Sequence, residues 1–205
     1  SPEYVGNREF RPGDSIRRLD MRAWGRIGAP VVREFQEEYF LRLALVLDTY
    51  IPRLRLPRAA GYPQLEAAIS LTATITDALS RGEYLIDIFA AGPELYAFRT
   101  GRATTHFDSV LEILACIDAC RVNPFETVTP ALADELGNIA SVMFVFLDWD
   151  AARRDMVRIA EECGCRTRVF LVRDGATSLP LETASDVPVT VLTPAAVHAG
   201  GFGVL

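Results

Sequence analysis

Two short apolar runs that each end in an aspartate constrain the fold of this chain most strongly. One reads LRLALVLD from Leu41 to Asp48, and the other extends from Ile139 to Asp148. Runs of this length without polar alternation are typical of strands buried on both faces in a parallel sheet. The carboxyl ends of parallel strands share one edge of the sheet, where open α/β sheets bind ligands. The sequence therefore predicts an α/β fold with Asp48 and Asp148 at that edge.

Other segments alternate between strand and helix patterns. Two β-prone runs joined by Ala-Ala-Gly-Pro, 83–89 and 94–98, indicate an antiparallel edge hairpin. Four helices are expected. The first covers residues 65–79, and the second begins at a capping box at Thr105. The third has Pro130 in its first turn, and the fourth extends from an N-cap at Asp150 to Gly164, which ends it. Strands at 166–173 and 187–192 complete a mostly parallel sheet of about six strands with helices on both faces.

The composition excludes several classes of chemistry. The chain has 205 residues, 50% of them hydrophobic and 23% charged, which fits a single globular domain. Its 21 basic residues are all arginine, so neither a phosphate-loop lysine nor a Schiff base is available. The net charge is −6, and residues 104–162 carry eleven acids against four arginines. Binding to nucleic acid or anionic lipid mainly through charge is therefore not expected.

Residues 1–35 differ from the rest, with seven arginines against five acids. Glycines and prolines interrupt this stretch, which predicts an extended, turn-rich lead-in. Two roles stay open for its arginines: pairing with carboxylates of this domain, or with the acidic face of a partner. Interleaved apolar residues favour the first role, so we expect residues 1–35 to pack on residues 36–205 in one structural domain. The interleaved residues are Ile16, Leu19, Met21, Trp24 and Ile27, and the arginines are Arg17, Arg18, Arg22, Arg26 and Arg33.

The cysteines and the longest apolar run predict neither a metal site nor a membrane span. Cys116/Cys120 and Cys163/Cys165 lack the C-x₂-C spacing of zinc knuckles and are expected to be reduced thiols. The run that ends at Leu147 is far shorter than the ~20 residues of a spanning helix. The first residue is Ser1, so we expect the chain to be part of a longer protein.

A specific pattern runs through the lead-in and into the first strand. It contains Pro-Gly-Asp, spaced arginines, and a Val-x-Glu-Phe-like segment before LALVLD, and its residues are Pro12, Gly13, Asp14, Arg17, Asp20, Arg26, Glu34 and Phe35. This pattern resembles the bacterial family called domain of unknown function 58, closely over residues 8–48 and elsewhere by the order of elements. The chain departs from the family at Met21, Trp24 and Gly25.

The resemblance implies a von Willebrand factor A-like, Rossmann-like fold. Such domains often hold magnesium in an Asp-x-Ser-x-Ser loop, which a threonine and a later aspartate complete. Here Tyr50 and Pro52 replace both serines, which removes two hydroxyl ligands. We therefore expect a degenerate metal site, for which Asp48, Thr104, Thr105 and Asp148 are the remaining candidates, and no bound cofactor.

The resemblance also implies a function and a location. Family members are expected to be anchored by an upstream membrane hairpin, with this domain on the cytoplasmic side of the bacterial membrane beside a MoxR-type AAA+ ATPase. The leading hypothesis is a non-enzymatic protein-binding adaptor. Its expected contacts lie at the carboxyl edge and are Tyr50, Arg53, Arg55, Arg102 and Trp149. The alternative for Trp149 is simple packing beneath the loop.

An enzyme is the competing hypothesis. A metal-dependent phosphatase-like hydrolase could use Asp48, Asp148 and Asp150, because Phe-Leu-Asp-Trp-Asp follows an apolar strand. The lysine that normally stabilises the transferring phosphoryl group is missing. A Ser-His-Asp hydrolase would have to use His106 or His198, and the sequence has no Gly-x-Ser-x-Gly elbow.

Overall fold

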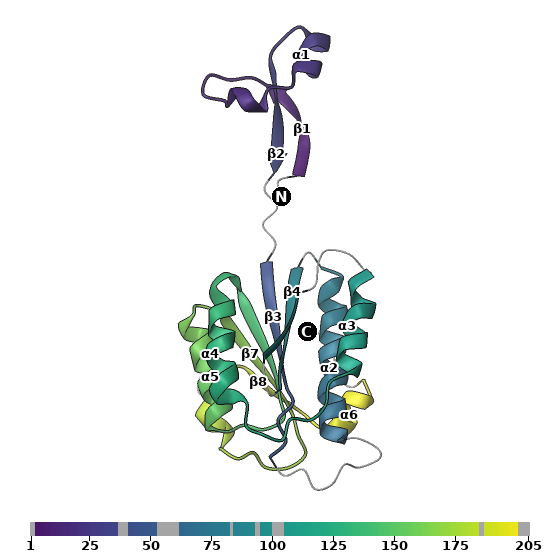
Figure 1. The fold of residues 1–205 in the computed structure, drawn as a ribbon, viewed down its shortest axis with the longest axis vertical. Helices are drawn as coiled ribbons and strands as arrows, with labels where there is room; N and C mark the ends of the chain where they lie inside the picture. The colour runs from purple at the N-terminus through teal and green to yellow at the C-terminus, as the bar shows by residue number, and fades with distance from the viewer. Residues whose placement is uncertain are drawn as a thin grey trace. The chain divides into compact units, whose positions relative to one another are not determined.

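The structure, a computed structural model, describes residues 3–36, 41–52, 62–82, 84–92, 95–99, 105–184 and 187–200. The chain divides into two compact units, Ser1–Phe40 and Leu41–Leu205. We call them the N-terminal unit and the sheet unit and describe each by itself; their elements carry the labels of Figure 1. The expectation that the lead-in packs on the sheet unit stays a prediction.

The N-terminal unit is an antiparallel strand pair, not the extended lead-in expected from the sequence. Strand β1 (Glu3–Glu9) pairs with β2 (Val31–Gln36). Between them lie the short 3₁₀ helix η1 (Ile16–Arg18) and helix α1 (Met21–Ile27). Asp20 caps α1 by accepting hydrogen bonds from the amides of Arg22 and Ala23, at 3.1 and 3.0 Å. Gly28, with φ +76°, ends the helix in the left-handed conformation that glycine allows.

Ion pairs hold the N-terminal unit together. The guanidinium of Arg8 donates two hydrogen bonds of 2.7 Å to Asp14, which lowers the pKa of Asp14 to about 2. Arg8 also lies 3.6 Å from Glu34, and Arg33 lies 3.5 Å from Asp20. Asp14, Asp20 and Glu34 belong to the family pattern, so these acidic positions of the pattern have structural partners here.

The sheet unit contains the predicted six-stranded sheet. Its strands lie in the order β5-β4-β3-β6-β7-β8, parallel except for the antiparallel pair of β4 and β5 at one edge. Counted from β3, this order is 3-2-1-4-5-6, the Rossmann-like order in which a crevice forms beside the first strand. The von Willebrand factor A-like α/β fold is therefore confirmed. The strands are β3 (Leu41–Asp48), β4 (Tyr84–Ala91), β5 (Leu95–Arg99), β6 (Ser141–Phe146), β7 (Arg166–Val172) and β8 (Val189–Leu192).

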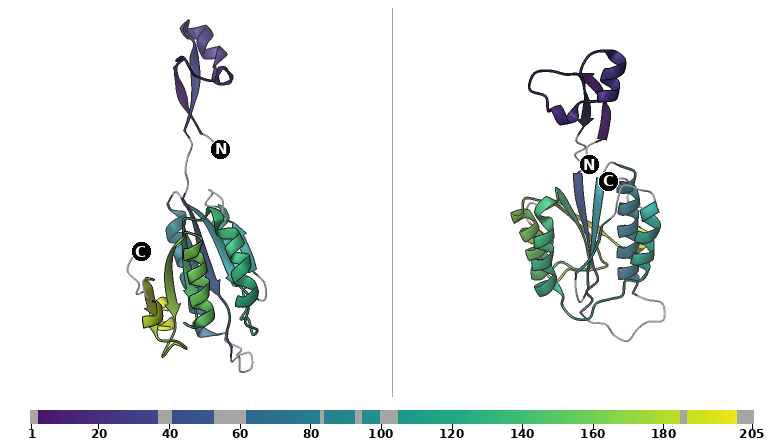
Figure 2. Two further views of the ribbon diagram at one scale, coloured as in Figure 1. Left: turned by 90° about the vertical axis from the view of Figure 1, so that its left-hand side faces the viewer. Right: turned by 45° about the horizontal axis from the view of Figure 1, so that its top comes forward.

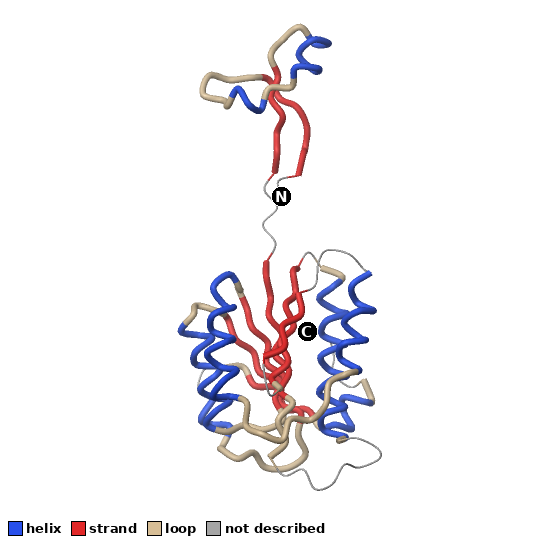
Figure 3. Tube along the Cα trace, viewed as in Figure 1, coloured by secondary structure: helices blue, strands red, loops and turns tan. Residues whose placement is uncertain are grey.

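Helices cover both faces of this sheet, as Figures 1 and 2 show. Helices α4 (Phe125–Glu135) and α5 (Ala151–Glu162) lie on one face. Helices α2 (Pro63–Ser80), α3 (Thr105–Ala115) and α6 (Pro194–His198) lie on the other, and in Figure 3 the red strands lie between the two layers of blue helices. Short 3₁₀ helices, η2 (Leu136–Asn138) and η3 (Leu181–Ala184), follow α4 and precede β8.

Strand β3 shows why its sequence has no polar alternation. Ala44 and Val46 pack in the core beneath α4 and α5, whereas Leu45 and Leu47 pack in the core beneath α2 and α3. All four side chains have no exposed surface, because both faces of the strand are covered.

Helix α4 begins at Phe125, so Pro130 lies inside the helix and not in its first turn. Asp150 caps α5 as predicted, and Gly164, with φ +85°, follows its last turn. Within the described residues, none of the helices is both long and apolar enough to cross a bilayer.

Candidate functional site

The candidate site lies where the strand order reverses. Strands β3 and β6 are neighbours, and the chain leaves them toward α2 on one face and α5 on the other. Asp48 is the last residue of β3, and Asp148 follows β6 by two residues. Ligands of open α/β sheets bind at such a switch point, so this edge is the first place to look for function.

A buried ion pair occupies this point. The Oδ2 atom of Asp48 lies 2.7 Å from both Nε and Nη2 of Arg153, and neither side chain exposes more than 1% of its surface. The same carboxylate accepts hydrogen bonds from the amides of Tyr50 and Leu147, at 2.8 and 3.0 Å. Both oxygens of Asp48 are therefore engaged by groups of the protein itself.

The guanidinium of Arg153 is surrounded on its other sides as well. It donates to Asp150, which also caps α5, and to the backbone carbonyl of Tyr50 at 3.2 Å. Its central carbon lies 4.8 Å from the centre of the Phe125 ring and 5.7 Å from that of Tyr50, in cation–π contact. Burial by itself lowers the pKa of Arg153. The nearby carboxylates, Asp48 above all, raise it by more, so the pKa lies above its usual value and the guanidinium stays charged.

Asp148 has a separate set of partners. It accepts hydrogen bonds from the amide and hydroxyl of Ser178, at 3.0 and 2.6 Å, and from the amide of Trp149. Arg173 lies 3.2 Å away. Burial raises the pKa of Asp148, but the bonds from Ser178 and Trp149 and the charge of Arg173 outweigh it, and the pKa is lower than usual. This carboxylate is ionised and fixes the segment that carries Ser178.

These residues do not fit a divalent metal. Mg²⁺ requires near-octahedral oxygen ligands, whereas the oxygens of Asp48 accept bonds from two amides and a guanidinium. Among the residues that the structure describes, acids, histidines and cysteines form no cluster that could hold a metal ion. Thr104 lies outside the described residues, and Thr105 begins α3 without a described side chain.

The expected partner-binding residues have different surroundings. Tyr50 is half-buried and packs edge-on against Phe125, with ring centres 6.1 Å apart. Trp149 is 1% exposed and packs near Phe146, so its expected role as a surface contact is wrong, and it lies beneath the loop instead. Arg53, Arg55 and Arg102 lie outside the described residues.

A polar cavity of about 490 Å³ opens beside Asp148, between Tyr50 and Arg173. The side-chain amide of Gln64 on α2 donates to the carbonyls of Leu147 and Val172, so α2 is tied to the ends of β6 and β7. The sequence analysis missed Gln64, Arg173 and Ser178. No local pattern distinguishes these residues before the fold brings them together.

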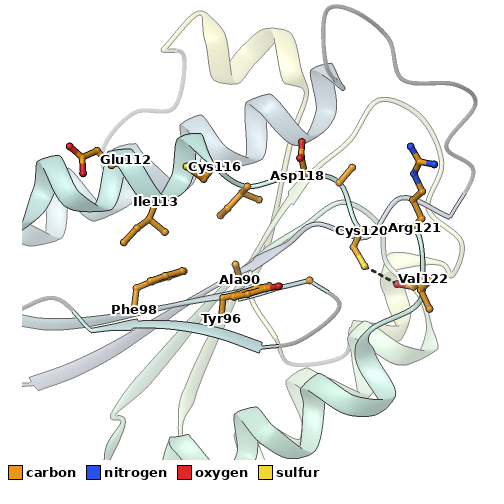
Figure 4. Close-up of a pocket in the computed structure, with 13 residues that line it drawn as sticks. Ala90, Tyr96, Phe98, Glu112, Ile113, Cys116, Asp118, Cys120, Arg121 and Val122 are labelled. Carbon is orange, nitrogen blue, oxygen red and sulfur yellow. Dashed lines mark hydrogen bonds between the residues drawn. The ribbon is translucent and has the colours of Figure 1, made fainter.

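An apolar cavity of about 850 Å³ lies between the β4–β5 hairpin and the segment from α3 to Val122. Figure 4 shows Ile113 of α3 facing Phe98 of β5, with Tyr96 and Ala90 beside it. The thiol of Cys120 at its border donates to the carbonyl of Val122 at 3.0 Å. No pattern in the sequence predicts this cavity.

Arg153 is the most informative residue that the sequence analysis missed. It lies three residues after the N-cap and precedes Met156, Val157 and Ala160 on the buried face of α5. An arginine at the start of an apolar helix face is a detectable signal, because a buried guanidinium requires nearby carboxylates.

The chain was compared with solved structures, with curated proteins and with protein families. The chain is similar in structure to BatB from Bacteroides thetaiotaomicron, with 10% identity, 78% of this chain and 94% of that chain covered, and a TM-score of 0.49. An aerotolerance-related membrane protein from Bacteroides fragilis gives 13% identity, 72% and 75% coverage, and a TM-score of 0.41. Human Sec24c, a COPII-coat protein, gives 10% identity, with 75% of this chain and 30% of that chain covered, and a TM-score of 0.43. No curated protein matches the chain.

A sequence model of one family spans both units. It matches residues 6–185, which include the ion-paired strand pair of the N-terminal unit and the sheet through β7. The family is described as "Protein of unknown function DUF58", and the chain belongs to it.

Proposed function

We propose that this chain is a non-enzymatic, protein-binding adaptor domain whose carboxyl edge works without a divalent ion. The observation that carries the proposal is the buried guanidinium of Arg153 between Asp48 and Asp150. A metal-dependent domain offers an open coordination position to the acidic group of a partner. Here the cation is covalently tethered and buried, so a partner has to bind the rim of the site.

The competing hydrolase is disfavoured by the same contacts. A nucleophilic carboxylate needs a free oxygen near the substrate, and a phosphoryl group needs an accessible cation. Asp48 is buried against Arg153, Asp150 caps α5, and Asp148 is bonded to Ser178. None of these three carboxylates is poised for attack.

The proposed contact surface is the rim around the polar cavity. Tyr50 and Arg173 both line it, and both side chains are partly exposed. Tyrosine and arginine dominate the binding energy of many interfaces. Arg53 and Arg55 remain part of the proposal on the strength of the sequence, since they follow β3 in the chain. Strand β5 runs antiparallel to β4 and ends at Arg99 opposite Asp87, away from the carboxyl edge, so the order of the chain does not support Arg102.

The family pattern suggests the biological setting. We propose a longer parent protein anchored in a bacterial membrane, with this domain on the cytoplasmic side and a MoxR-type AAA+ ATPase as the partner. The structure-based part of the proposal, a metal-free interface, can be tested separately from the identity of that partner.

Titration calorimetry of the chain with the proposed partner, a MoxR-type AAA+ ATPase, tests this function. We expect the same affinity in EDTA and in Mg²⁺, and an approximately tenfold loss on Tyr50→Ala or on the Arg53→Ala/Arg55→Ala double substitution. Arg81→Ala is the matched control, because Arg81 is exposed just beyond α2 and pairs with Asp77. Loss of binding in EDTA would contradict the metal-free interface. Phosphatase turnover that Asp150→Asn abolishes would favour the hydrolase.

A further inference from the structure

Four large apolar side chains are exposed on one short stretch of the N-terminal unit. Ile16 of η1 exposes 76% of its surface, and Met21 and Ile27 of α1 expose 68% and 64%. Trp24, which lies between Met21 and Ile27 on α1, exposes 36% of its surface. Burying such side chains is favourable, so a surface that exposes four of them within twelve residues points to a binding partner.

Arginines are interleaved with these apolar residues. Arg17, Arg18, Arg22 and Arg26 are all exposed. Within the described parts of the chain, none of the four side chains has an ion pair or a hydrogen bond. We call this stretch, Ile16 to Ile27, the Arg-apolar tip.

Two of the acids near the tip are already neutralised, and the exposed Glu9 at the end of β1 leaves a single negative charge against the four arginines. Asp14 accepts two hydrogen bonds from Arg8, and Asp20 caps α1 and lies 3.5 Å from Arg33. The unpaired charge of the tip is therefore positive, although the whole chain carries −6. Figure 1 shows η1 and α1 together at the end of the β1–β2 pair that is opposite to the unit's chain ends.

We propose that the Arg-apolar tip docks on an anionic phospholipid surface. Arginine guanidiniums pair with lipid phosphates. Each arginine that lies near an anionic membrane surface strengthens binding about fivefold. Tryptophan and aliphatic side chains enter the boundary between headgroups and acyl chains. The tip supplies both parts from neighbouring residues, and a fluid lipid surface requires no shaped counterpart. The overall negative charge of the chain restricts the contact to this tip.

Vesicle binding by the whole chain tests the proposal. Co-sedimentation compares phosphatidylcholine vesicles with vesicles that also contain phosphatidylglycerol. We expect binding only to the anionic vesicles, with an approximately 25-fold loss on the double substitution Arg22→Gln/Arg26→Gln. The matched control is Arg81→Gln/Arg158→Gln, which removes two exposed arginines from the sheet unit and is expected to leave binding unchanged.

A second readout places the tip in the membrane. The chain has two tryptophans, and in a Trp149→Phe variant Trp24 is the single tryptophan, which can be excited selectively over the six tyrosines. We expect a blue shift of its emission with anionic vesicles and quenching by lipids labelled in the acyl chain. Absence of binding by the wild-type chain, or equal loss in the control variant, would overturn the proposal. So would binding of soluble polyglutamate through the same arginines without binding to vesicles, which would indicate an acidic protein as the partner.

Discussion

Removal of the Arg153 side chain is the most direct perturbation of the carboxyl edge. Arg153→Ala leaves the carboxyl of Asp48 buried beside two backbone amides, without its counter-ion. Breaking a buried ion pair from one side typically costs about 3–5 kcal/mol, a large share of the ~5–15 kcal/mol that stabilises a domain. We therefore expect a large decrease in the free energy of unfolding, with Asp48 as the cause.

Urea denaturation followed by circular dichroism measures this change. Urea is preferable to guanidinium chloride, because free guanidinium could occupy the space left by Arg153. Replacing both partners, Asp48→Asn with Arg153→Met, is expected to recover much of the loss, since a neutral pair needs no counter-ion. Arg158→Ala is the control: its pairs with Asp155 and Glu162 are exposed and worth about 0–1 kcal/mol. A cost below about 1 kcal/mol for Arg153→Ala would refute the reasoning.

Three further predictions concern metal, pH and the N-terminal unit. Millimolar Mg²⁺ or Mn²⁺ is expected to leave the melting temperature unchanged in calorimetry, whereas a real site at 100 times its Kd would add ~2.7 kcal/mol; a saturable shift that Asp48→Ala abolishes would contradict this. Asp14 has a folded-state pKa of about 2 against an ordinary 3.8, so its contribution is complete above pH 4 and is lost as pH falls toward 2. Melting temperatures between pH 5 and 2 are therefore expected to fall less steeply for Asp14→Asn, and an identical slope would argue against the Arg8 pair. The sequence also predicts that the N-terminal unit packs on the remainder, in which case deletion of residues 8–35 lowers the stability of the remainder; unchanged melting would contradict that packing and leave the Arg-apolar tip free for a lipid surface.

The parts of the fold that follow from local pattern were predictable. Strand β3 begins at Leu41 and ends at Asp48 as expected, since burial on both faces leaves an unbroken apolar run. The antiparallel edge followed from the Ala-Ala-Gly-Pro connection, and the start of α5 followed from Asp150. Each of these signals depends on residues close together in the chain.

The parts that depend on distant contacts were not predictable. Strands β1 and β2 are separated by 21 residues of turns and short helices, so no periodic pattern indicates their pairing. The place of Arg153 at the start of the apolar face of α5 is visible in the sequence, but only the fold identifies Asp48, 105 positions away, as its partner. For Trp149 the sequence leaves a surface contact and packing inside the fold both open, and only the fold shows that the side chain is buried at the end of β6.

The near balance of charge at the carboxyl edge affects how quickly a partner can associate. Among the described residues of this edge, three carboxylates, Asp48, Asp148 and Asp150, face two guanidiniums, Arg153 and Arg173, and all five are paired. These paired groups have little long-range field, and electrostatic steering accelerates association only where one sign of charge dominates. Any dependence of the association rate on ionic strength is therefore expected to come from Arg53 and Arg55, and the lifetime of a complex would depend on contacts formed after the two proteins meet.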